Sequence, residues 1–150
     1  MDERHQHTLG EPHIKLSGLQ IWVQRRQFPD SNDYWDGNWL QVVTHCGASG
    51  SNVWVSGPIL HLSEIKSWQD SIEKLYKTLS GEANLNCMEP ELYVSLKSKK
   101  LGQIEMEVQI TPEHLSQEHR YTFMLDQSYL KPLLASCKRI LKEYPIKGKP

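Results

Sequence analysis

The chain has 150 residues, of which 38% are hydrophobic and 23% are charged, and its 17 basic and 18 acidic side chains give a formal net charge of -1. A chain of this kind can bury a core of its own as one globular domain. The charge balance argues against direct nucleic-acid binding, because such proteins gain much of their affinity from a basic surface. No segment approaches the roughly 18 apolar residues of a membrane span, and no apolar core of a signal peptide is visible. We therefore expect a cytoplasmic protein with no membrane partner.

A single α+β domain is expected over residues 13–144. Residues 1–12 lack periodic apolar positions and are predicted to form a flexible arm, and residues 145–150 a short tail. Alternation of apolar and polar side chains predicts strands that bury one face. The segment 47–50 contains two glycines and predicts a hairpin between its neighbouring strands. The predicted strands are 19–24, 39–46, 52–59, 92–97, 103–110 and 120–125, with a further short strand at 83–88.

Two segments have the periodicity of amphipathic helices. The first spans 62–79, with Ser63 as its expected N-cap and Gly81 just past its end, and the second spans 130–141. Pro132 places the start of the second helix close to that residue, since proline is tolerated in a first turn. We predict an antiparallel sheet of about six or seven strands, with both helices packed on one face of it.

The sequence contains no common catalytic or nucleotide-binding motif: GxxxxGK[ST], GxGxxG, GxSxG and HExxH are all missing. Cys46, Cys87 and Cys137 form no CxxC pair, and the seven histidines are scattered, so no metal and no cofactor are predicted. Glu105 and Glu107 share one face of a predicted strand and could act as paired carboxylates. Ion pairs across the sheet explain this arrangement more simply. We therefore predict no catalytic residue and no enzymatic activity.

The most unusual stretch is segment 33–40, with the sequence DYWDGNWL. Its centre is typical of a tight turn that enters a strand, because Gly37 can adopt a positive φ. In one interpretation, Trp35 and Trp39 close one end of the core while Asp36 caps the turn. In the other, part of the loop is exposed and binds a partner, since tryptophan and tyrosine are preferred interface anchors. The residues with this structural or partner-binding role are Asp33, Tyr34, Trp35, Asp36, Gly37, Asn38 and Trp39.

The same eight residues resemble the signature of the WapI-like immunity proteins of bacterial contact-dependent and polymorphic toxin systems. Other family features follow in order: LYKTLSGEA at 75–83, a strand at 91–96, and FMLDQSYL at 123–130 before the last helix. The resemblance covers most of the chain from about Leu19 to Leu141. It implies a protein that binds a cognate toxin domain, often a nuclease, inside the producing cell and blocks it. It implies no catalytic residues.

Three hypotheses from different functional classes follow. The leading one is immunity by stoichiometric toxin binding, in which an acidic strip of Glu105, Glu107 and Glu118 would mimic phosphate and steer association with a basic cleft. The second is a self-associating structural module that pairs through the polar face of its sheet. The third is a small hydrolase that uses Asp33, Asp36 and a histidine, which would have to converge in one pocket.

Overall fold

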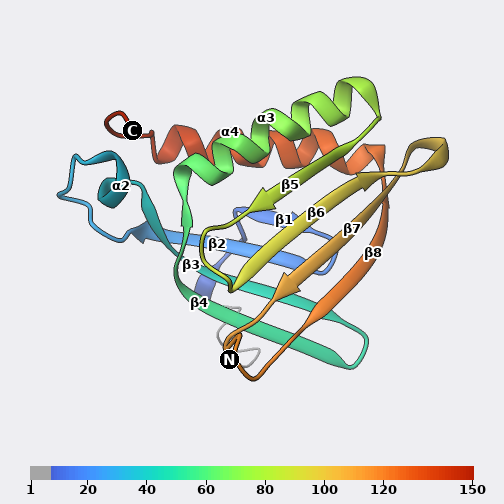
Figure 1. Cartoon of the computed structure of the whole chain (residues 1–150), viewed down its shortest axis with the longest axis horizontal. Coiled ribbons are helices and arrows are strands. Elements are labelled where there is room, and N and C mark those ends of the chain that lie inside the picture. Colours follow the sequence, from blue (N-terminus) through green and yellow to red (C-terminus); the bar gives the residue numbers. More distant parts are fainter. Residues whose placement is uncertain (1–7) are drawn as a thin grey trace.

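The computed structural model describes residues 8–150, which form eight strands and two long helices (Figure 1). No helix in this part of the chain is long and apolar enough to cross a membrane. The elements in chain order are β1 (Ile14–Leu16), β2 (Leu19–Arg26), α2 (Tyr34–Gly37), β3 (Trp39–Ala48), β4 (Ser51–His61), α3 (Leu62–Thr78), β5 (Glu82–Asn86), β6 (Leu92–Ser98), η1 (Lys100–Gly102), β7 (Gln103–Ile110), β8 (Arg120–Asp126), η2 (Gln127–Tyr129) and α4 (Leu130–Glu143).

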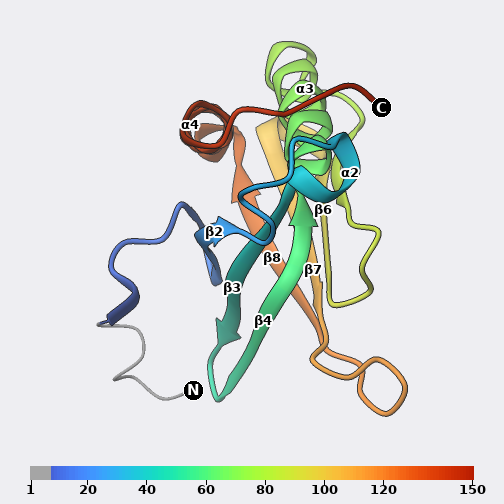
Figure 2. The same ribbon diagram turned by 90° about the vertical axis from the view of Figure 1, so that its left-hand side faces the viewer.

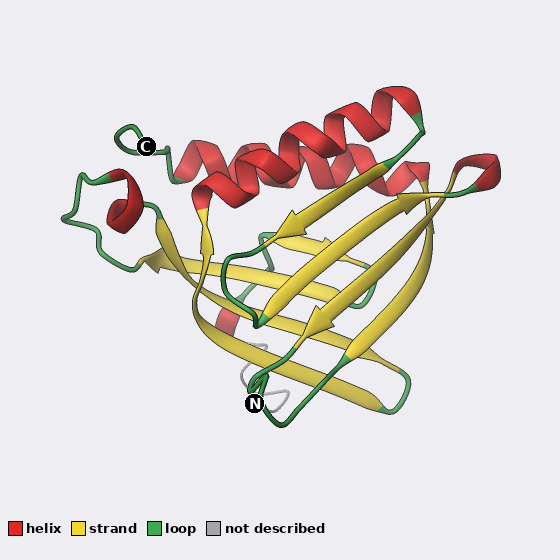
Figure 3. Cartoon of the chain, viewed as in Figure 1, coloured by secondary structure: helices red, strands yellow, loops and turns green. Residues whose placement is uncertain are grey.

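The strands form two antiparallel sheets, each a simple meander of four strands in the orders β1-β2-β3-β4 and β5-β6-β7-β8 (Figure 3). The α+β class is confirmed, but the prediction of one sheet with six or seven strands is wrong. Helix α3 carries the chain from the end of the first sheet to the start of the second. Alternation predicts only that each strand buries one face, and two sheets that face each other satisfy it as well as one sheet covered by helices.

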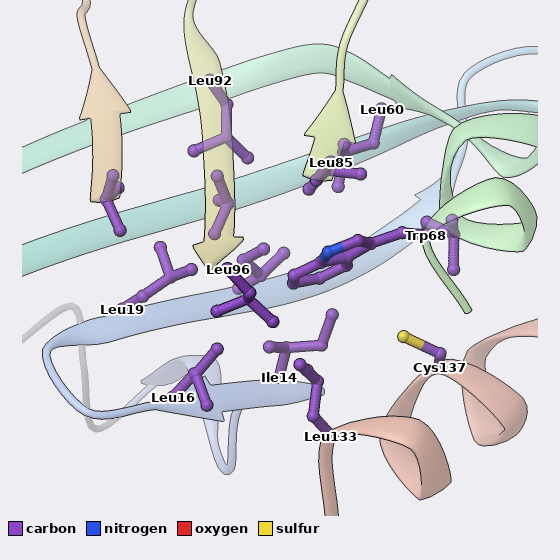
Figure 4. Packing of buried hydrophobic residues seen from close by; sticks show 14 of the residues in the cluster. Ile14, Leu16, Leu19, Leu60, Trp68, Leu85, Leu92, Leu96, Leu133 and Cys137 are labelled. Carbon is purple, nitrogen blue, oxygen red and sulfur yellow. The ribbon is translucent and has the colours of Figure 1, made fainter. Parts of the chain in front are cut away.

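The two long helices close one open side between the sheets (Figure 2). Helix α3 contacts β5, helix α4 contacts β1, and the helices pack against each other. The apolar faces of both sheets and both helices enclose one common core. Trp68 of α3 is completely buried in it and lies among Leu85, Leu96 and Ile14 (Figure 4). Its indole Nε1 donates a hydrogen bond to the Ala83 carbonyl oxygen at 3.2 Å.

The hairpin of β3 and β4 is confirmed and is the longest in the fold. Its register runs from the pair Ala48↔Ser51 beside the turn to the pair Trp39↔His61 at the far end. The far end leads directly into α3 on one side and back to α2 on the other. The hairpin therefore brings the DYWDGNWL segment against the start of α3, although the two are separated by more than twenty residues in the sequence.

The described part of the predicted arm makes contact with the first sheet. The Gly10 carbonyl oxygen accepts a hydrogen bond from the Trp22 indole at 2.9 Å. His13, the first residue of the predicted domain, accepts one through Nδ1 from the Val23 backbone N–H at 2.9 Å. The arm was predicted for residues 1–12, of which 1–7 lie outside the described residues.

Candidate functional site

The DYWDGNWL segment begins with a one-turn helix, α2, rather than a simple turn. The Asp33 carboxylate accepts hydrogen bonds from the backbone N–H groups of Trp35 and Asp36, both at 3.0 Å. Asp33 therefore caps this turn, and the expectation that Asp36 caps it is wrong, because Asp33 occupies the N-cap position and Asp36 lies within the helical turn. Gly37 does not adopt a positive φ. It is needed for close approach, since a Cβ atom there would lie 2.8 Å from the Ser31 carbonyl oxygen.

Asn38 is the polar centre of this corner and is completely buried. Its Nδ2 donates to the carbonyl oxygens of Tyr34 at 2.7 Å and Lys147 at 2.9 Å. Its Oδ1 accepts from the Lys147 backbone N–H at 2.9 Å and from Arg26 Nη1 at 3.3 Å. One amide thus joins α2, strand β2 and the C-terminal segment, and uses its full hydrogen-bonding capacity.

The C-terminal segment 145–150, expected as a tail, is held against the same loop, and Figure 1 shows the C-terminus and α2 at one end of the molecule. The Lys147 ammonium donates to the carbonyl oxygens of Pro29 at 2.8 Å and Ser31 at 3.0 Å. Arg26 donates to the Gly37 carbonyl at 2.7 Å and to the Pro145 carbonyl. Both cations therefore fix backbone carbonyl groups of the loop.

His61 fills the space beneath the aromatic side chains and is completely buried. Its ring centroid lies 5.5 Å from that of Tyr34, 5.6 Å from Trp35 and 5.0 Å from Trp39. Nδ1 accepts from the Ser63 backbone N–H at 3.2 Å, and Nε2 lies 3.2 Å from the Trp35 carbonyl oxygen. These partners assign a neutral ring that is protonated at Nε2. Burial lowers the pKa of His61 below its ordinary value of 6.5.

The buried, neutral His61 makes the stability of the domain depend on pH. Below pH 6.5 the unfolded chain takes up a proton that the folded state resists, so the free energy of unfolding falls as the pH is lowered. We expect the wild type to lose stability between about pH 7 and 5 more steeply than His61→Gln, as measured by urea unfolding. His114→Gln, at an exposed loop position, is the matched control and should keep the wild-type slope. Equal slopes in all three proteins would contradict a neutral His61.

His61 and Glu64 together cap helix α3. Glu64 Oε1 accepts from the His61 backbone N–H at 2.8 Å, while Oε2 accepts from the Met88 backbone N–H at 2.6 Å. The predicted N-cap Ser63 is therefore wrong, since His61 occupies that position in a capping box. Burial raises the pKa of Glu64. Through Met88, this carboxyl also fixes the connection between β5 and β6 beside α2.

Two pockets each include residues of α2 and of the β5–β6 connection in their linings. Their linings define what we call the corner surface, which exposes three large apolar side chains: Phe28 (47% exposed), Trp35 (51%) and Met88 (55%). The first pocket, of about 390 Å³, is lined by Gln27, Phe28, Asp36, Trp39, Pro58, Ile59, Glu89 and Glu91. The second, of about 360 Å³, is lined by Trp35, Ser63, Glu64, Ser67, Asn84, Asn86 and Met88.

The comparison with known families tests the family resemblance found in the sequence. A model described as the Immunity protein WapI-like family matches residues 12–145. The chain belongs to the WapI-like immunity protein family. The match confirms the resemblance carried by the DYWDGNWL segment and extends over nearly the whole chain. No curated protein and no solved structure is found to match it.

In this WapI-like protein the predicted acidic strip is paired with basic side chains on the same sheet. Glu105 lies 3.8 Å from Lys99, and Arg120 lies 2.8 Å from Glu107 and 3.8 Å from Glu118. Arg120 thus brings Glu107 and Glu118 together. These partners reduce the net negative charge of the strip, although the pairs are partly exposed and contribute little to stability.

The groups named for a hydrolase do not converge. The Asp33 carboxylate serves as a helix cap, and both ring nitrogens of His61 have hydrogen-bond partners. Asp36 lines the first pocket, whose described lining includes neither Asp33 nor a histidine. Within residues 8–150, no group of three or more histidine, cysteine or acidic side chains could hold a metal ion.

Proposed function

We propose that this WapI-like protein protects its producing cell by binding a toxin domain in the cytoplasm and blocking it stoichiometrically, without catalysis. The observation that carries the proposal is the family match over residues 12–145. The corner surface supports it, because exposed tryptophan, phenylalanine and methionine side chains beside charged groups are typical of protein-binding surfaces.

A nuclease is the toxin class that we favour. The substrate cleft of a nuclease is basic because it binds phosphate groups, and a protein that blocks it gains affinity and speed from acidic side chains. The first pocket carries three carboxylates, from Asp36, Glu89 and Glu91. The acidic strip adds further carboxylates on the second sheet.

The test in cells is co-expression with the toxin encoded in the neighbouring reading frame. We expect cells that express both proteins to survive, and cells that express the toxin alone to die. The two proteins should also copurify when the toxin carries an inactivating substitution, because binding does not require toxin activity. The proposal would be contradicted if cells that express the toxin survived without this protein, or if the protein protected them without binding the toxin.

Charge reversal of the acidic strip tests its role in steering. In a variant with Glu105, Glu107 and Glu118 all changed to lysine, we expect association with the toxin to slow roughly three- to tenfold at low salt, with little change in dissociation. Asp70→Lys, which reverses an exposed carboxylate paired with Lys66 on α3, is the control. Stopped-flow or surface-based kinetics would measure both rates. An unchanged association rate would show that the strip takes no part in recognition.

A further inference from the structure

We propose that the corner surface is the docking site for the partner, and that its first pocket receives an arginine side chain from a basic surface of that partner. This inference rests on the proposed function, since the partner is the toxin. The corner surface and the negative charge of its first pocket are the features that would recognise the toxin.

Both pockets of the corner surface have large apolar side chains in their linings, and α2 contributes a residue to each. Phe28 and Trp39 line the first pocket, and Trp35 and Met88 line the second. Asp36, adjacent to Trp35 in α2, lies in the first pocket and so links the two linings. Leu101, in the short η1 segment between β6 and β7, is also fully exposed, but it lines neither pocket. Several large apolar groups around two hollows provide the water-excluding surroundings that interface anchors need.

The charge of the first pocket selects a cation. Asp36, Glu89 and Glu91 line it, and among the described residues no lysine, arginine or histidine lines either pocket. Within the described chain, none of these three carboxylates forms a salt bridge. Glu91 Oε2 is buried and accepts no hydrogen bond from the described residues. Three carboxylates in one pocket without a basic partner favour a ligand group that brings positive charge and N–H donors.

The combination of aromatic and acidic side chains in the first pocket favours arginine over lysine. Trp39 and Phe28 provide aromatic surfaces beside the carboxylates. A guanidinium group can stack on an aromatic ring while its fork of N–H donors bonds to carboxylate oxygens, whereas an ammonium is more strongly hydrated and less suited to stacking. The pocket therefore provides both an aromatic surface for stacking and carboxylate acceptors for the guanidinium N–H groups.

The surface is rigid before the partner arrives. Asp33 fixes the start of α2, Asn38 fixes its end, and His61 supports Tyr34 and Trp35 from below. A preorganised surface loses less conformational entropy when it binds, so more of the contact energy appears as affinity.

Two variants test the docking site with the full-length protein and the inactivated toxin from the neighbouring reading frame. Glu91→Gln keeps the shape of the side chain but removes its charge, and Phe28→Ser removes an exposed apolar contact. We expect each to raise the Kd roughly 10- to 100-fold, mainly through faster dissociation. Glu73→Gln, at a carboxylate on α3 that is paired with Lys77 at 3.7 Å and lines neither pocket, is the control and should leave the Kd unchanged.

Thermal unfolding of the same variants separates binding from folding. Glu91→Gln should keep the melting temperature close to that of the wild type, because the partly exposed carboxylate that it replaces forms no salt bridge with another described residue. Weaker binding with undiminished stability supports the proposal. Wild-type affinity in both variants overturns it, whereas no toxin binding by the wild type overturns the proposed function itself. A dimer of the chain alone that either variant dissociates would also overturn it, because a second copy would then be the occupant.

Discussion

Replacing Trp68 with alanine is expected to destabilise the domain by about 3–5 kcal/mol, the usual cost of deleting a buried indole. The side chain is completely buried between the two sheets, and its loss also leaves the Ala83 carbonyl without its donor. This loss is a large part of the 5–15 kcal/mol that is typical of domain stability. The free energy of unfolding would be measured by urea denaturation followed by far-ultraviolet circular dichroism.

Trp54 provides the matched control for Trp68. It is only partly buried, and it stacks on Trp22 with ring centroids 5.8 Å apart. Trp54→Ala should therefore cost only about 1 kcal/mol, within the range of an aromatic pair. Equal losses in the two variants would contradict a core centred on Trp68.

Asn38→Ala is expected to lower the stability by about 3 kcal/mol and to release the C-terminal segment. The substitution leaves the carbonyl oxygens of Tyr34 and Lys147 and the Lys147 N–H without their partners in a buried site, and each such loss costs about 1–3 kcal/mol. Hydrogen exchange should increase at residues 145–150 more than in the core strands, because Asn38 makes both of the buried hydrogen bonds to the Lys147 backbone.

The control for Asn38 is Asn32→Ala, at an exposed position of the same loop. It should leave both the stability and the exchange rates close to those of the wild type. Unchanged exchange at the C-terminus of Asn38→Ala would show that the tail is held by other contacts.

The strands were readily predicted where alternation is regular. Strand β7 buries Ile104, Met106, Val108 and Ile110 and leaves the residues between them less buried, as the sequence pattern indicates. Strand β1 was missed because three residues are too few to establish a period. The division into two sheets could not be predicted from alternation. Whether the apolar face of a sheet is covered by helices or by a second sheet depends on contacts between strands that are distant in the sequence.

The corner could be located from its composition, but its construction could not be predicted. Asn38 and Lys147 are 109 residues apart, and no local pattern joins them. The sequence contains two local signals of helix capping. Asp33 is a residue type preferred at the N-cap, and it directly precedes α2. Glu64 lies three residues after His61, which is the spacing of a capping box. The second was overlooked because histidine is an uncommon N-cap. The exposure of Phe28 and Met88 depends on tertiary packing alone.

We propose that this protein blocks a toxin by binding it in a fixed ratio. The most direct measurement is a titration of the purified toxin domain with the purified protein, with residual toxin activity as the readout. We predict that activity falls linearly and reaches zero at a ratio of one to one when both proteins are well above their Kd. Toxin activity that is unaffected by excess protein, or that a small fraction of an equivalent abolishes by turnover, would contradict the claim.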